Sequence, residues 1–284
     1  MERERWLQVY QLLRQLDSGK CRGIFTAAAI LGVCFWAVIH DRPVCWACCA
    51  RNWPRGLWLG SLPSQATMSR RLRDARVLEL QQRVEEQLRT WHKLDSPIKC
   101  IDAKPLPVGG CSKDRQASWG RGARGWAKGY KLYAIWGDRD LPHVWRVAAM
   151  GQSEQSMAEI MIPELTGGGV LLGDKLYDIN KLYDASARVG YQLLAARKRP
   201  NAGLGKYEHS PARLRSIAWL KTKAGQQLYQ QRVRIERRFA GLTCFGGGLT
   251  PLPSWVRTLH RVRLWVQAKL ILNALRLRAL RAIA

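Results

Sequence analysis

GGVLLGDKLYD, residues 168–178, is the stretch that decides the fold class. Its apolar run between glycines predicts a buried strand over 168–173 that ends directly before Asp174. An Asp just past the end of an inner strand lies where α/β sheets place their chemistry. Asp178 is expected to be the N-cap of a following helix over 179–189, because Asp accepts well from the free N–H groups of a first helical turn.

A second Asp interrupts an apolar strand upstream. Residues 98–106, IKCIDAKPL, predict a strand that contains Asp102. A carboxylate in such a strand is costly unless it faces a ligand or an ion. The other core elements are predicted strands at 130–136, 143–149 and 191–196 and a short helix at 157–165. This order favours an α/β fold with a mixed sheet flanked by helices.

A lone acid among arginines lies further along the chain. Residues 229–243, YQQRVRIERRFAGLT, predict a helix that places Tyr229, Arg232 and Glu236 on one face. Two interpretations stay open. The segment is either a surface helix with internal ion pairs, or Glu236 binds a metal beside arginines such as Arg237 that hold a phosphate backbone.

The spacing of these residues resembles the Tyr-x2-Arg-x3-Glu-x6-Lys/Arg signature of bacterial insertion-sequence transposases of the DDE type. Thr243 stands where that family has a basic residue. Three further segments resemble family motifs: IDAKPLPV around Asp102, Gly-Tyr-Lys-Leu at 129–132, and Gly-Asp-x-x-Tyr-Asp at 173–178. The resemblance implies an RNase H-like catalytic core.

The resemblance also implies an activity. The chain would be a DNA transposase that binds element ends, cleaves strands and transfers them into target DNA. Asp102, Asp174 and Glu236 would be the catalytic residues and the ligands of two Mg²⁺ ions, for which Mn²⁺ can substitute. Tyr229, Arg232, Lys131 and Arg237 are the predicted DNA contacts of this core.

Three other functions remain open. The chain could be a catalytically inactive DNA-binding relative, which the departure at Thr243 favours. It could be a structure-specific nuclease of the same fold without strand transfer. A membrane-surface protein is the remaining alternative.

The first 95 residues predict an all-α DNA-binding region. Residues 23–39 are mostly apolar but too short to span a membrane, so a buried helix is expected. A helix-turn-helix-like segment over 43–74 would end in a short helix capped by Ser64, with three DNA contacts: Gln65, Arg70 and Arg71. A plain capped helix with a basic solvated face is the alternative. The catalytic core would occupy 96–258, and a basic C-terminal helix over 259–284 would pack on it.

Gly, Ser, Arg and Lys dominate residues 109–129, which predicts a flexible basic loop. Its amides and cations could line a phosphate path, and Trp119 or Trp126 could stack on a base. A solvated hairpin loop is equally open. Residues 197–207 form a second basic loop.

The net charge of +26 indicates a polyanionic partner, most simply nucleic acid. We expect double-stranded DNA, both terminal inverted repeats and target, bound by a homodimer or higher oligomer, and no membrane. The eight Cys are irregularly spaced, which favours free thiols in a reducing compartment. The expected location is therefore the bacterial cytoplasm, in association with the nucleoid.

Overall fold

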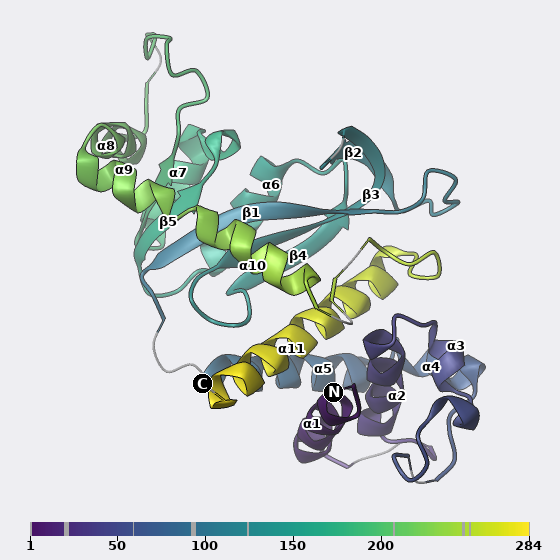
Figure 1. Cartoon of the computed structure of the whole chain (residues 1–284). Coiled ribbons are helices and arrows are strands. Elements are labelled where there is room, and N and C mark those ends of the chain that lie inside the picture. The colour runs from purple at the N-terminus through teal and green to yellow at the C-terminus, as the bar shows by residue number, and fades with distance from the viewer. Residues whose placement is uncertain are drawn as a thin grey trace. The chain divides into compact units, whose positions relative to one another are not determined.

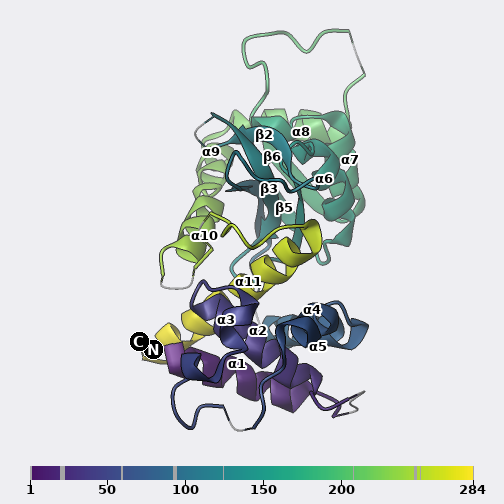
Figure 2. The ribbon, with the colours of Figure 1, turned by 90° about the vertical axis from the view of Figure 1, so that its right-hand side faces the viewer.

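The chain forms two compact units, which are described separately. The computed structural model describes residues 2–19, 23–58, 60–91, 95–123, 125–206, 208–245, 248–249 and 251–283. The first unit contains Met1–Lys93, Leu242–Leu249 and Leu264–Ala284, and the second contains Leu94–Gly241 and Thr250–Arg263. Figure 1 labels most elements of both units, and Figure 2 labels β6.

The second unit is built on a mixed sheet, which has six strands in the described residues. The strands are β1 (Ile98–Pro107), β2 (Ser118–Gly122), β3 (Gly125–Trp136), β4 (Val144–Ala149), β5 (Gly169–Gly173) and β6 (Tyr191–Ala195). Five of them follow the order β2-β3-β1-β5-β6, and β4, which lies off this path, pairs with β3. β5 runs parallel to both β1 and β6, while β1 and β3 are antiparallel. β3 and β4 are antiparallel neighbours, and they correspond to the strands predicted at 130–136 and 143–149.

Helices cover both faces of this sheet, as Figure 2 shows. They are α6 (Glu154–Met161), α7 (Asn180–Arg188), α8 (Pro211–Leu220), α9 (Lys223–Gln230) and α10 (Val233–Thr243), with 3₁₀ turns at Ile162–Glu164 and Lys175–Tyr177. Ile101, Leu171 and Leu193 are buried on the face that packs against α6 and α7. Side chains alternate along a strand, so Cys100 faces the other way, and its Sγ donates to the Gln231 carbonyl at 3.8 Å.

A β-hairpin replaces part of the flexible loop that was expected at 109–129. β2 and the first half of β3 pair in antiparallel register. A Cβ added to Gly120 would lie 2.5 Å from the Met150 carbonyl oxygen, and one added to Gly129 would lie 2.4 Å from that of Leu106. The glycines therefore permit close backbone packing, and their number misled the prediction of flexibility.

The first unit is helical. Its elements are α1 (Glu2–Leu16), α2 (Ala27–Ile39), α3 (Val44–Ala47), a 3₁₀ turn at Ala50–Asn52, α4 (Gln65–Arg71), α5 (Ala75–Thr90) and the later part of α11 (Leu259–Ile283). Trp6, Trp36 and Trp53 pack ring against ring, and the Trp6 indole donates to the Gly32 carbonyl at 2.8 Å. Among the described residues, the helices are too short or too polar to span a bilayer.

The C-terminal helix α11 begins in the second unit and continues in the first. Its residues from Leu264 onward group with the N-terminal helices, whereas the sequence predicted that the whole helix packs on the catalytic core. The buried Lys269 helps to hold this part of the helix in the first unit. Its Nζ donates to the Val38 carbonyl at 2.9 Å and pairs with Asp41 at 2.5 Å. A cation at full burial needs such partners.

Side chains of the β1–β2 connection hold the start of α11. The Asp114 carboxylate accepts from the Thr258 N–H at 2.8 Å and from the Tyr130 hydroxyl at 2.7 Å. Gln116 Oε1 accepts from the Leu259 N–H at 2.7 Å. Thr258 itself has a φ of 70°, a left-handed conformation that is strained for a β-branched residue. The cap of this helix therefore comes from a distant part of the chain.

Candidate active site

The two predicted aspartates lie at the same level of neighbouring parallel strands. β1 and β5 pair with Cys100 opposite Leu172; Asp102 lies two residues further along β1, and Asp174 directly follows Gly173, the last residue of β5. Asp102 Oδ1 accepts from the Ala103 N–H at 2.8 Å, and Asp174 Oδ1 accepts from the Leu176 N–H at 2.7 Å. In the described part of the chain neither carboxylate forms a salt bridge. Their remaining oxygen atoms can therefore serve as ligands.

Negative charge accumulates around Asp102. Burial raises the pKa of Asp102 to about 6, the charges of Glu154 and Asp174 add to the rise, and the Ala103 N–H and Arg232 oppose it. Burial also raises the pKa of the Tyr177 hydroxyl, and the same three carboxylates contribute. Carboxylates in this arrangement repel one another and favour a neutralising cation.

Tyr229 connects the ends of two strands beside Asp174. Its hydroxyl donates to the Gly173 carbonyl at 3.0 Å and accepts from the Ala196 N–H at 3.4 Å. Burial raises the pKa of this hydroxyl. Tyr229 belongs to α9, which ends at Gln230, so the single helix predicted over 229–243 is wrong. The chain turns at 231–232 before α10 begins.

Glu236 lies on α10, in a more open position than the aspartates. Its side chain is 55% exposed, and its Oε1 lies 3.3 Å from Arg232 Nη2. The charge of Arg232 also acts on Asp102 and Tyr229, so this guanidinium lies near these two residues as well as near Glu236. Among the described residues, no three His, Cys, Asp or Glu side chains are close enough together to hold a metal ion.

A family model described as Transposase DDE domain matches residues 93–271. The chain belongs to this family of transposases. The match includes all three predicted catalytic acids, and it supports the RNase H-like core predicted from the motifs. No curated protein and no solved structure matches the chain.

Lys131 of this transposase is buried rather than presented to solvent. Its Nζ lies 2.8 Å from Oε1 of Glu154, at the start of α6. A DNA contact by Lys131 therefore requires this ion pair to open. Sequence reasoning missed Glu154, because an acid in the first turn of a helix is ordinary.

Asp178 does not cap α7. The N-cap position is Ile179, which makes no side-chain cap, and the Asp178 carboxylate instead receives two hydrogen bonds from Arg213, at 2.7 Å and 2.9 Å. It also accepts from the Lys198 N–H at 3.0 Å. The pair holds α8 and the basic loop after β6 near the carboxyl end of the sheet. Burial alone would raise the pKa of Asp178, but these hydrogen bonds lower it overall.

The other predicted DNA contacts lie on two helices. Arg237 is exposed on α10, and Gln65 and Arg70 are exposed on α4, while Arg71 is half-buried. Ser64 caps α4 as predicted. The connection between α3 and α4 covers 48–64, which is longer than the short turn of a helix-turn-helix.

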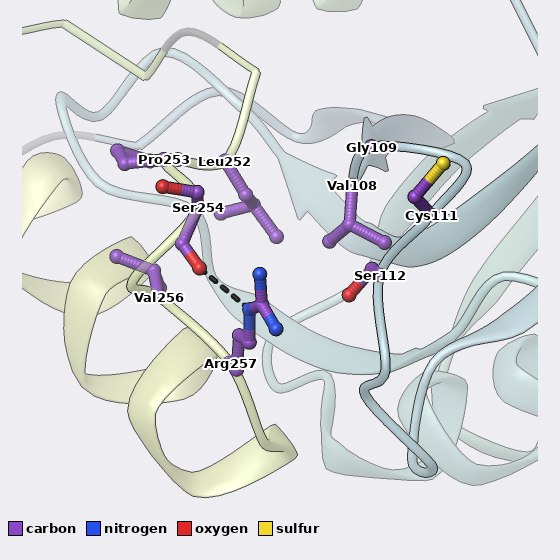
Figure 3. A pocket seen from close by; sticks show the side chains of 9 residues that line it. All are labelled: Val108, Gly109, Cys111, Ser112, Leu252, Pro253, Ser254, Val256 and Arg257. Carbon is purple, nitrogen blue, oxygen red and sulfur yellow. Dashed lines mark hydrogen bonds between the residues drawn. The ribbon is translucent and has the colours of Figure 1, made fainter.

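A cavity of about 160 Å³ lies elsewhere in the transposase core, between 108–112 and 252–257. Figure 3 shows the Arg257 guanidinium between these two segments. Its Nε donates to the Ser254 carbonyl at 2.6 Å. None of the predicted catalytic acids lines this cavity.

Proposed function

We propose that this chain binds the ends of an insertion sequence, cleaves a DNA strand there and transfers the end into target DNA. One observation supports the proposal above the others. Asp102 and Asp174 lie level on adjoining strands, with Tyr229 and Arg232 beside them, in a chain of net charge +26.

Asp102 and Asp174 suit a hard divalent cation. They offer oxygen atoms only, and Mg²⁺ is commonly held by one or two carboxylates while waters and substrate phosphates complete its shell. We assign Glu236 as the third ligand and two Mg²⁺ ions, replaceable by Mn²⁺, to the site. Such ions activate an attacking hydroxyl and stabilise the leaving oxygen of an in-line displacement.

Arg232 and Glu236 act together in this proposal. Their present contact of 3.3 Å occupies both groups. When Glu236 turns toward the aspartates, Arg232 is released to donate to a phosphate oxygen, where charge-assisted hydrogen bonds are strong. Tyr229 holds the carbonyl that directly precedes Asp174, and so it positions that carboxylate.

DNA is the proposed partner along a wider surface. Gln65, Arg70 and Arg71 on α4 and Arg237 on α10 are the side chains that we assign to duplex contacts, and Lys131 would join them only after leaving Glu154. Pairing of two element ends requires a homodimer or a larger oligomer. Because the proposed substrate is DNA, we infer that the protein acts in the cytoplasm, on the nucleoid.

The test is cleavage of supercoiled DNA that carries the element's own ends, with Mg²⁺ or Mn²⁺. The variants are Asp102→Asn and Glu236→Gln, and the control is Glu159→Gln, an exposed acid on α6. We expect the wild type and the control to cut and join DNA, and both site variants to bind DNA without cutting it. Binding without cleavage by the wild type would instead indicate the inactive relative. Cleavage without joined products would indicate a nuclease.

A further inference from the structure

The β2–β3 hairpin has two chemically different faces. Trp119 lies opposite Lys128, and Arg121 lies opposite Trp126. Directly opposed residues share a face of an antiparallel pair, as do residues two apart on one strand. All four side chains therefore lie on the same face, which we call the Trp/Arg face.

The opposite face of the hairpin consists of small residues: Gly120, Gly122, Ala127 and Gly129. It lies against the turn at Met150, and a Cβ on Gly120 would approach that carbonyl oxygen to 2.5 Å. The Ser118 hydroxyl accepts from the Gly151 N–H at 2.7 Å, which holds the hairpin to the same turn. Side chains as large as indoles cannot fit there, so the Trp/Arg face is fixed outward.

Both indoles on the Trp/Arg face are open to solvent. Trp119 is 57% exposed and Trp126 is 78% exposed, and in the described part of the chain neither ring stacks on another aromatic ring. Arg121 is also exposed and has no acidic partner among the described residues, and Lys128 donates only to the Ser112 carbonyl, at 2.7 Å. Large apolar groups left exposed together mark an interaction surface.

The chemistry of this surface selects its partner. Two flat aromatic rings match the faces of nucleobases, and two cations without carboxylate partners match phosphates. A fully paired duplex keeps its bases stacked on one another, so only unpaired nucleotides offer free base faces. We propose that the Trp/Arg face binds unpaired nucleotides of a DNA strand, with the indoles stacked on bases and Arg121 and Lys128 on phosphates.

Strand β3 runs from the Trp/Arg face to the level of Asp102. Asp102 is level with Ala134 on β3, which is six residues from Lys128 and eight from Trp126. At roughly 3.3 Å per residue, the separation along β3 is about 20 to 26 Å. That length corresponds to about six to eight nucleotides at the spacing of roughly 3.4 Å that one strand has in duplex DNA. The inference rests on the proposed function, because the DNA strand bound by the Trp/Arg face would be the strand that is cleaved at Asp102 and Asp174.

The experiment measures fluorescence anisotropy without divalent cations, so that cleavage does not interfere. The probes are labelled oligothymidylate, an abasic strand of the same length and a blunt duplex. The variants are Trp119→Ala, Trp126→Ala and Arg121→Gln. The matched controls are Trp255→Ala and Arg188→Gln, whose side chains are exposed elsewhere.

Each Trp variant should weaken oligothymidylate binding by about fivefold or more, the range found for loss of one stacking side chain. Binding of the abasic strand should not change, while Arg121→Gln should weaken binding of both strands. The controls should match the wild type.

Two results would overturn the inference. One is unchanged oligothymidylate binding in both Trp variants, or an equal loss for the abasic strand. The other is a dimer that dissociates in Trp126→Ala, which would assign the Trp/Arg face to a protein contact. If the expected pattern appears but supercoiled DNA is never cut, the proposed catalysis fails and this inference stands.

Discussion

Asp114→Asn tests whether one carboxylate holds the start of α11. Asp114 is 5% exposed, and the donors to its carboxylate include the Tyr130 hydroxyl, the Thr258 N–H and, at 3.0 Å, the Gln116 N–H. Asn has a single acceptor oxygen. If that oxygen keeps the first two donors, the amide NH₂ group faces the Gln116 N–H, and one charge-assisted hydrogen bond is lost. We expect a loss of about 3 kcal/mol in the free energy of unfolding.

Urea unfolding at pH 7 measures this loss, with an unchanged m-value as evidence that only stability has changed. A decrease of this size would lower Tm by about 6 to 12 °C. Amide hydrogen exchange should show faster exchange at Thr258 and Leu259, because their acceptors lie on and beside Asp114. Glu159→Gln is the control for loss of one surface charge.

The pH dependence of the same variant gives a second test. Burial alone would raise the pKa of Asp114, but hydrogen bonds from Tyr130, Thr258 and Gln116 lower it overall. Because the pKa of Asp114 in the folded protein is below the unfolded value of about 3.9, the stability that its carboxylate contributes is fully present above a pH of about 3.9. It is lost as pH falls through the folded pKa. The stability gap between wild type and variant should therefore narrow in acid, and equal midpoints at pH 7, or a gap that widens in acid, would refute the reasoning.

Two further predictions concern the sheet and its carboxyl end. Gly129→Ala should destabilise the second unit by about 2 kcal/mol, because the added Cβ would meet the Leu106 carbonyl. The control Gly109→Ala, whose added Cβ would have no atom within 4 Å, should change stability little. Thermal unfolding measures both variants, and equal Tm values would show that the close packing at Gly129 is unimportant. Arg213→Met should cost about 3 kcal/mol in urea unfolding, because it leaves the buried Asp178 carboxylate without its cation, and a midpoint equal to the wild type would contradict that role.

Local patterns were sufficient for the parts of the fold that local chemistry determines. The apolar run before Asp174 predicted β5, and Ser64 predicted the cap of α4, because each signal lies within a few residues of the feature it specifies. At 118–129 the sequence left a flexible loop and a solvated hairpin loop equally open, for the opposite reason. Its glycines are required by a turn at Met150, which is distant in sequence, and nothing near them distinguishes close packing from flexibility.

Two site features depended on partners that a single sequence does not reveal. Asp178 precedes a helix and satisfies every local rule for a cap, yet Arg213 binds it from a helix 35 residues away. Glu154 looks like an ordinary first-turn acid, and only the fold brings its charge to Asp102. For Asp178, a long-range ion pair prevailed over a local capping preference worth about 1 kcal/mol.

The spacing from Tyr229 to Glu236 matches the family signature, but its physical basis is not the single helix that was predicted. A continuous helix would place Tyr229 and Glu236 on one face, but the chain turns between them, where the Gln231 and Arg232 amides donate to carbonyls three residues earlier. No Gly or Pro marks this turn. Its cause is tertiary, because the Tyr229 hydroxyl is held between the ends of β5 and β6. The turn leaves Arg232 at the corner, within reach of Glu236 and close enough to Asp102 to act on its charge. The family spacing therefore corresponds here to an arginine at a corner between two helices, in contact with Glu236 and near Asp102, rather than to a stripe along one helix.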